Sequence, residues 1–208
     1  MNIEEFLLQD EIKELIAAGD LETVYEKYYP PKYRGELSEY LLNRGINPLN
    51  YFTNSIPDHA FMCCHDLEIL TIPDGITAIG ADAFNGCDEV ESVTIGDSVT
   101  SIGYYAFGNC GSLEEVITGE NSRLTHIGVY AFVFCSALKR ITIPSGVIEI
   151  GADAFNSCDD LEDIYYKGTK AQWRKIKKGE YWYVPELDET TPPTIHCIDG
   201  DIRLKQQF

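Results

Sequence analysis

Positive charge is scarce in this sequence, where 16 Lys and Arg residues stand against 34 Asp and Glu residues and give a formal net charge of −18 at pH 7. The imbalance is concentrated in residues 54–166, which carry 3 basic and 18 acidic side chains, a net charge of −15. A surface of this sign repels phosphate backbones and anionic lipid headgroups. The charge therefore argues against nucleic acid or a membrane surface as the partner.

Long apolar runs are also absent, since none approaches the roughly 20 residues that a helix needs to cross a bilayer. The N-terminus, Met1-Asn2-Ile3-Glu4-Glu5, is acidic where a secretory signal would be basic. We therefore expect no membrane insertion and a cytoplasmic location. The alternative is a cell-surface or secreted protein that is exported by a route not visible at its N-terminus.

Catalytic motifs are missing as well: the sequence has no nucleophile elbow, no phosphate-binding glycine loop and no paired His and acid motif. His59, Cys63, Cys64 and His65 lie close enough together to suggest a metal site. However, Cys64 occupies a repeated position that is expected to face the core, and the other three occupy positions that vary between repeats. We expect no enzyme, no metal site and no cofactor.

An Ala-Phe pair recurs in the sequence, starting at residues 60, 83, 106, 131 and 154, with spacings of 23, 23, 25 and 23 residues. Each Phe is followed three residues later by a cysteine, and each cysteine three residues later by Leu or Val. A short β-rich run comes next, then a turn at Pro or Gly, a second apolar pair and a glycine. Such regularity is typical of a solenoid.

One unit of this length is too short to close a core alone, so neighbouring units must stack. Strands stacked at roughly 4.8 Å form a parallel sheet with Phe, Leu and Ile inside. The pattern of apolar strand, Pro or Gly turn, Ile-Gly, Ala-Phe and Cys resembles the BspA-type leucine-rich repeat family. The resemblance implies an α/β repeat solenoid, a short right-handed array with a parallel sheet on one face, and it does not imply one function.

We divide the chain into three parts. Residues 54–166 hold a half repeat and four turns. Residues 1–53 are expected to form a helical capping domain, with helices in 2–18, in 21–29 and around 37–42, the last closed by Gly45. Residues 167–208 are expected to form a C-terminal cap: a helix that opens with a Thr169 and Gln172 capping box and ends at Gly179, and strands at 181–184 and 194–197. Caps are required because terminal repeats would otherwise expose apolar surface.

Five of the seven cysteines, Cys64, Cys87, Cys110, Cys135 and Cys158, occupy the same repeat position. Equivalent side chains on successive turns point the same way and are poorly oriented for disulfides. We therefore expect five reduced cysteines in the core, where each acts as a small hydrophobe. This agrees with a reducing compartment.

Two surfaces are candidates for binding a partner. The first is the exposed sheet face, formed by outward strand positions Ile69, Thr71, Ser92, Thr94, Glu115, Ile117, Arg140, Thr142, Asp163 and Tyr165. The second is an apolar, tyrosine-rich patch in turns three and four, where other turns hold small or polar residues, formed by Tyr104, Tyr105, Tyr130, Val133 and Phe134. The alternative for the first surface is simple solvation, and for the second it is side chains that fold back over their own turns.

The sequence thus favours a non-catalytic protein-binding or scaffolding module. Two alternatives stay open: an adhesin-like module that binds host protein or glycan, and a self-assembling structural component. The expected partner is a protein, which includes a second copy of this chain in a homo-oligomer.

Overall fold

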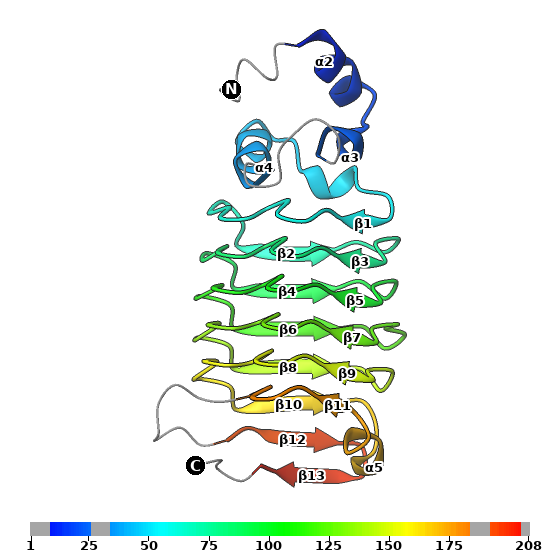
Figure 1. Ribbon diagram of the computed structural model, residues 1–208, viewed down its shortest axis with the longest axis vertical. Coiled ribbons are helices and arrows are strands. Elements are labelled where there is room, and N and C mark those ends of the chain that lie inside the picture. Colours follow the sequence, from blue (N-terminus) through cyan, green and yellow to red (C-terminus); the bar gives the residue numbers. More distant parts are fainter. Residues whose placement is uncertain (1–8, 26–33, 184–191, 205–208) are drawn as a thin grey trace.

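The computed structural model describes residues 9–25, 34–183 and 192–204, and Figure 1 shows them as a column of stacked turns with helices at the N-terminal end. The long strands form one seven-stranded sheet, in the order β13-β12-β10-β8-β6-β4-β2. Its strands are parallel except for the antiparallel pair at the C-terminal end. They are β2 (Ile69–Ile72), β4 (Ser92–Ile95), β6 (Glu115–Thr118), β8 (Arg140–Ile143), β10 (Asp163–Tyr166), β12 (Thr194–Cys197) and β13 (Gly200–Arg203).

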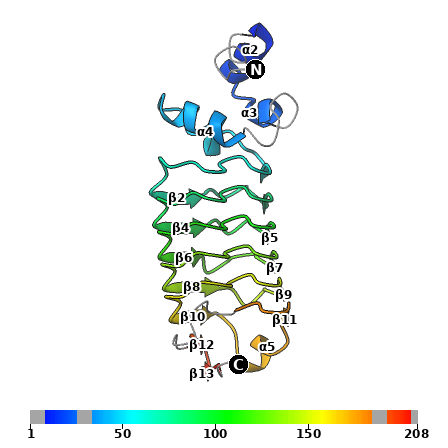
Figure 2. The same ribbon diagram turned by 60° about the vertical axis from the view of Figure 1, so that its left-hand side comes forward.

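Two-residue strands form a second sheet of six parallel strands, and Figure 2 shows the two sheets on different sides of the column. From β1 to β12 the chain alternates between the sheets, so each turn contributes one strand to each, and residues 54–166 contain no helix. The expected repeat solenoid is confirmed, and its units are built from β-strands and turns. The short strands are β1 (Ser55–Ile56), β3 (Ala78–Ile79), β5 (Ser101–Ile102), β7 (His126–Ile127), β9 (Glu149–Ile150) and β11 (Lys177–Lys178).

The repeated phenylalanines form a stack through the core. Their ring centroids are 5.0, 5.2, 5.3 and 5.4 Å apart from turn to turn, with neighbouring rings nearly parallel. All five rings have no exposed surface. The stack follows from the pairing of the strands residue for residue, which superimposes each repeat position on its equivalent in the next turn. Its members are Phe61, Phe84, Phe107, Phe132 and Phe155.

The five repeat cysteines are free thiols with no exposed surface, as predicted. Four of them donate a weak hydrogen bond to the carbonyl of a repeat phenylalanine in the preceding turn, as Cys87 does to Phe61 and Cys135 to Phe107, both with Sγ 3.0 Å from the oxygen. Burial raises the pKa of the Cys87, Cys135 and Cys158 thiols, so they stay protonated. The position therefore suits a residue that is small, apolar and still a donor.

At the N-terminal end lie α2 (Asp10–Ala17), α3 (Leu21–Thr23), α4 (Arg34–Leu42) and the 3-10 helix η3 (Pro48–Asn50). The predicted start of the first helix and the end of the second one, from residue 26 on, lie outside the described residues. The Asp20 carboxylate caps α3 by accepting a hydrogen bond from the Thr23 amide, 3.2 Å away. Gly45 follows α4 in a left-handed conformation (φ +74°), as its C-cap role predicts.

The helices cover the first turn of the solenoid through aromatic contacts. Tyr25 packs edge-on against Phe52 at 5.2 Å, and Phe52 packs edge-on against Phe61, the first ring of the core stack, at 6.2 Å. Ser38 of α4 donates a hydrogen bond to the Ala60 carbonyl. A Cβ on Gly35 would lie 1.8 Å from the Met62 carbonyl oxygen, so α4 approaches the solenoid backbone directly.

The C-terminal part agrees only in part with the sequence analysis. The capping box of Thr169 and Gln172 is present, but α5 (Lys170–Trp173) ends well before Gly179. Residues 181–183 form turns and not a strand, β12 confirms the predicted strand at 194–197, and β13 was not predicted. Residues that we had assigned to the cap continue the array, since β11 pairs with β9 and the Trp182 carbonyl accepts a hydrogen bond from the Phe155 amide.

Candidate interaction surfaces

The segment between each short strand and the next long strand contains two positions with left-handed backbone. The first immediately precedes the Ala-Phe pair, and the second immediately precedes the repeat cysteine. We call these the left-handed positions. The first is occupied by His59, Asp82, Tyr105, Tyr130 and Asp153, and the second by Cys63, Gly86, Asn109, Phe134 and Ser157, with φ between +52° and +74°.

Gly, Asn and Asp tolerate this conformation because they have no Cβ or a short polar side chain that hydrogen-bonds locally. Asp82 and Asp153 do so here: each accepts a 2.8 Å hydrogen bond from the asparagine three residues later, Asn85 or Asn156. For a bulky residue the same conformation is a real outlier and costs on the order of 1–2 kcal/mol.

Three bulky aromatic residues, Tyr105, Tyr130 and Phe134, occupy left-handed positions in turns three and four. Together with the neighbouring Tyr104 and Val129 they form what we call the aromatic corner. Tyr104 is 50% exposed and Phe134 46% exposed. The fold accepts Asp, Asn, Gly or Ser at the equivalent places, so these aromatic residues are not needed to make the turns.

The three tyrosines contact one another. Ring centroids are 5.1 Å apart for Tyr104 and Tyr105, 5.2 Å for Tyr105 and Tyr130, and 5.8 Å for Tyr104 and Tyr130. Tyr105 packs over its own turn: its ring lies so close to Gly108 that a Cβ on this glycine would be 2.4 Å from it. Partial burial raises the pKa of the Tyr105 hydroxyl. The three tyrosine rings therefore meet, and Tyr105 also folds back over its own turn. That this patch binds a partner stays a prediction.

Val133 must be removed from the predicted patch. It is only 2% exposed, because its position in the turn faces the core, and Phe134 next to it carries the exposed surface. Phe134 lies four residues after Tyr130 on the same segment. Val129, 38% exposed, takes the place that the sequence analysis gave to Val133.

We expect Phe134→Asn to stabilise the protein by about 1 kcal/mol, since asparagine tolerates the left-handed conformation and little buried surface is lost. The measurement is the free energy of unfolding from urea denaturation. Phe134→Val is the matched control, because a β-branched residue keeps the strain and should give no gain. A loss of stability in Phe134→Asn would mean that the ring is packed for structural reasons.

The predicted sheet face is partly exposed. Ile69 is 74%, Ile117 38% and Tyr165 43% exposed. Thr71, Thr94 and Arg140 are exposed too, whereas Ser92, Glu115, Thr142 and Asp163 are half-buried. Neighbouring strands place Glu115 beside Arg140, whose Nε lies 2.6 Å from the carboxylate. The face therefore alternates in charge and apolar character, with no continuous apolar area.

His196 on β12 joins this face, which the sequence analysis missed because the pairing of β12 with β10 is not visible in the repeat period. Its Nε2 lies 2.7 Å from Asp163 and its Nδ1 3.0 Å from Asp201, and its ring stacks on Tyr165 at 5.0 Å. The hydrogen bond to Asp163 raises the pKa of His196, and Asp201 adds to the effect.

A histidine with a raised folded pKa contributes stability below its unfolded pKa of about 6.5 and loses it as pH rises through the folded pKa. We therefore expect the hairpin of β12 and β13 to be more stable at about pH 6 than at about pH 8. Amide hydrogen exchange at Ile195 and Ile202, corrected for intrinsic rates, measures this. His196→Gln should remove the pH dependence, and a hairpin of equal stability at both pH values would contradict the assignment.

The suggested metal ligands do not converge. Among residues 9–25, 34–183 and 192–204, no group of three His, Cys, Asp or Glu residues could hold a metal ion. Cys64 is buried, Cys63 is exposed, and His65 instead hydrogen-bonds to Asp88 at 2.6 Å.

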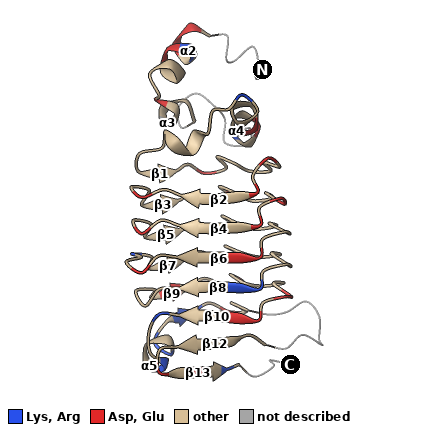
Figure 3. Cartoon of the chain, turned by 180° about the vertical axis from the view of Figure 1, so that it is seen from behind, with Lys and Arg blue, Asp and Glu red and all other residues tan. Residues whose placement is uncertain are grey.

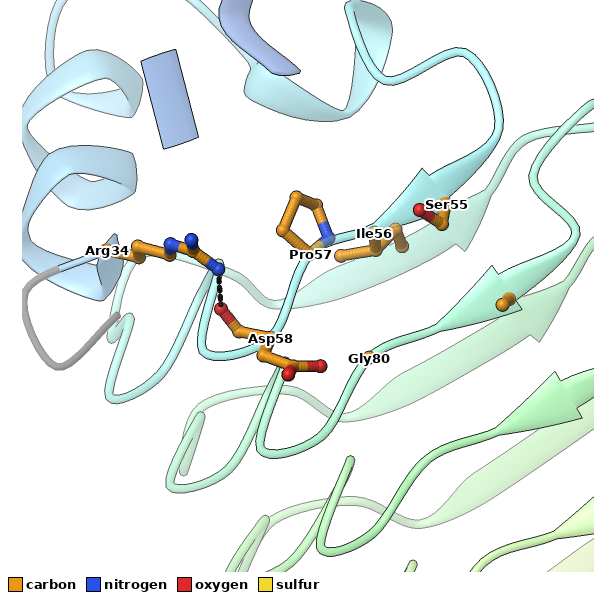
Figure 4. Close-up of a pocket in the computed structure, with 7 residues that line it drawn as sticks. Arg34, Ser55, Ile56, Pro57, Asp58 and Gly80 are labelled. Atoms are coloured by element: carbon orange, nitrogen blue, oxygen red, sulfur yellow. Dashed lines mark hydrogen bonds between the residues drawn. The ribbon is translucent and has the colours of Figure 1, made fainter. Parts of the chain in front are cut away.

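A cavity of about 450 Å³ lies between α4 and the first turn, bordered by Arg34, Pro57, Asp58 and Gly80. Figure 4 shows Arg34 reaching the Asp58 carbonyl, with Nη1 2.9 Å from the oxygen. This contact ties the helices to the solenoid. The lining shows no nucleophile paired with a base, so it gives no indication of catalysis.

The acidic and the basic residues lie in different parts of the column. Figure 3 shows red on most of the repeats, blue on β8 and further blue gathered around α5. Residues 167–179 contain six Lys and Arg and no Asp or Glu, in contrast to the acidic repeats. Within the described chain, no helix is long and apolar enough to cross a membrane.

Crystal structures of similar proteins are known. A leucine-rich repeat protein of T. pallidum is 26% identical over 64% of this chain and 64% of its own, with a TM-score of 0.51. One from Bacteroides ovatus is 34% identical over 55% of this chain and 30% of its own (TM-score 0.48), and a leucine-rich cell surface protein from Faecalibacterium prausnitzii is 30% identical over 53% and 35% (TM-score 0.42). The chain thus spans less than two thirds of each. No curated protein matches.

The model of the BspA-type leucine-rich repeat region matches residues 54–178 in six copies. This range covers more than half of the 208 residues and includes β11, in agreement with the continuation of the array beyond residue 166. Together with the repeated Ala-Phe and cysteine positions, the match shows that this chain belongs to the BspA-type leucine-rich repeat family.

Proposed function

We propose that this protein is a non-catalytic binding module that captures a partner protein through the aromatic corner. Leucine-rich repeats are typically protein-binding modules, and this fold is generally a scaffold without enzymatic activity. The single observation that carries the proposal is the presence of Tyr105, Tyr130 and Phe134 in left-handed backbone on two neighbouring turns, where the turns on either side use Asp, Gly or Ser.

Strained conformations persist where a function requires them. At Phe134 the burial gained on folding is small, because its side chain is 46% exposed, whereas the strained Tyr105 and Tyr130 are half-buried. Tyrosine is enriched among residues that dominate binding energy at protein interfaces, since it offers large contact area with little loss of conformational entropy. A surface of this kind supports contact with a protein.

The test is site-specific photo-crosslinking in source cells. A photoreactive amino acid replaces Phe134 in one variant and Ile148 in another, because Ile148 is also exposed (58%) but lies outside the corner. We expect a discrete crosslinked protein at position 134 and none at position 148. Tyr105→Ser combined with Phe134→Ser, assayed by binding of that protein, should weaken it at least about tenfold.

No crosslink at position 134, or an equal one at position 148, would contradict the proposal. A crosslink between two copies of this chain would favour the self-assembling component instead. We propose a location inside the cell, and protease shaving of intact cells tests it. Cleavage of this chain while a cytoplasmic control survives would move the adhesin-like alternative, with host protein or glycan as partner, to first place.

A further inference from the structure

The aromatic corner is bordered by carboxylates on both sides. Asp82 occupies the first left-handed position in the turn before Tyr105, and Asp153 occupies it in the turn after Tyr130. Backbone hydrogen bonds hold these turns side by side: the Asp82 amide donates to the Tyr104 carbonyl at 2.8 Å, and the Tyr130 amide to the Ala152 carbonyl at 3.0 Å. The two carboxylates thus lie one turn away from the tyrosines.

Positive charge is absent from this side of the repeats. The only Lys and Arg in residues 54–166 are Arg123, Lys139 and Arg140. Lys139 and Arg140 lie at and beside the start of β8 and pair with Glu114 and Glu115, and Arg123 lies in the turn that carries the two-residue insertion. None belongs to the segments that carry the left-handed positions.

The negative charge of the borders reaches the rings. After burial and the neighbouring tyrosines, Asp82 and Asp153 are further causes of the raised pKa of Tyr105. The hydrogen bonds from Asn85 and Asn156 orient these carboxylates without neutralising them, and Asp82 also lies 3.8 Å from Nε2 of His59, which adds positive charge only when it is protonated. The faces of tyrosine rings also carry negative potential, which attracts guanidinium and ammonium groups.

We propose that the aromatic corner binds a cationic segment of a partner protein, with Arg or Lys side chains placed over the rings of Tyr104 and Phe134 and between Asp82 and Asp153. This inference rests on the proposed function and adds the chemistry of the partner to it. Arginine fits best, because its planar guanidinium can stack on a ring and pair with a carboxylate at the same time.

The probe is a fluorescently labelled hexa-arginine peptide, with a Gly-Ser peptide of the same length as the neutral control, measured by fluorescence anisotropy against the full chain. Three double variants are compared. Tyr104→Ser with Phe134→Ser removes the rings, Asp82→Asn with Asp153→Asn removes the bordering charge, and Glu68→Gln with Glu91→Gln removes the same charge from exposed residues beside the strands.

We expect the ring variant and the Asp variant each to weaken hexa-arginine binding about five- to tenfold, a range typical of cation–π contacts and carboxylate pairs at partly exposed sites. The Glu68 and Glu91 variant should change it less than about twofold, because it alters only the general charge. Asn keeps the hydrogen-bonding capacity and tolerates the left-handed backbone, so the Asp variant should fold normally.

Equal weakening by the Asp pair and the Glu pair would mean general charge attraction and would overturn the proposal, as would binding no stronger than that of the Gly-Ser peptide. If the crosslink at position 134 persists but hexa-arginine does not compete with it, the cationic partner is wrong while the binding function stands. If the molecular mass in solution rises with protein concentration and the ring variant abolishes this rise, the aromatic corner binds the basic residues 170–178 of a second copy. That result would overturn the proposal of a separate partner protein.

Discussion

Phe107→Ala should lower the free energy of unfolding by about 3 to 5 kcal/mol, the range for truncating a fully buried phenylalanine. Phe107 is the middle ring of the core stack, 5.2 Å from Phe84 and 5.3 Å from Phe132, with no exposed surface. Stacked turns on both sides hold their spacing through backbone hydrogen bonds, so the cavity cannot collapse easily. Urea denaturation of the full chain measures the loss.

Phe134→Ala is the matched control, since it makes the same chemical change on an exposed ring of the next turn. We expect less than about 1 kcal/mol from it, because little apolar surface leaves water at that position on folding. A neutral urea midpoint for Phe107→Ala, or equal losses for the two variants, would contradict the register that aligns the Ala-Phe pairs in the core.

Gly103→Ala should destabilise by about 1 to 3 kcal/mol, toward the upper end, because the added methyl group meets backbone and not a movable side chain. An ideal Cβ at this position lies 2.7 Å from both the carbonyl carbon and oxygen of Gly80 in the preceding turn. Gly128 stands in the same relation to Gly103, with its Cβ 2.5 Å from the Gly103 oxygen. The glycines that follow the short strands thus permit the close stacking of turns.

Gly111→Ala provides the comparison, because a Cβ there meets nothing within 4 Å and its backbone is not left-handed. This variant should be neutral or more stable by about 0.4 to 1 kcal/mol, through the lower entropy of its unfolded chain. Thermal unfolding of both variants decides the matter. If Gly103→Ala had the same melting temperature as Gly111→Ala, close contact between turns would not be the reason for the glycine at position 103.

The solenoid could be predicted from the sequence alone. A period of 23 to 25 residues, with Phe, Cys and Leu at constant offsets, leaves one solution, because so short a unit can bury its apolar positions only against copies of itself. The same logic predicted the reduced cysteines and the exposed strand positions. Local signals succeeded where the chemistry is local, as in the capping box of Thr169 and the glycine after α4.

Other features depend on contacts between residues that are far apart in the sequence, or on the geometry of the turns, and could not be predicted. Val133 and Phe134 are adjacent apolar residues, and the turn geometry alone assigns one to the core and the other to solvent. The left-handed backbone at Tyr105, Tyr130 and Phe134 is invisible in their own sequence, because neighbouring turns impose it through hydrogen bonds between repeats. His196 meets Asp163 across a strand pairing that joins residues far apart in the chain. The repeat period shows which positions are equivalent. Contacts between turns determine the backbone conformation and the exposure of a residue that differs from the usual type at its position.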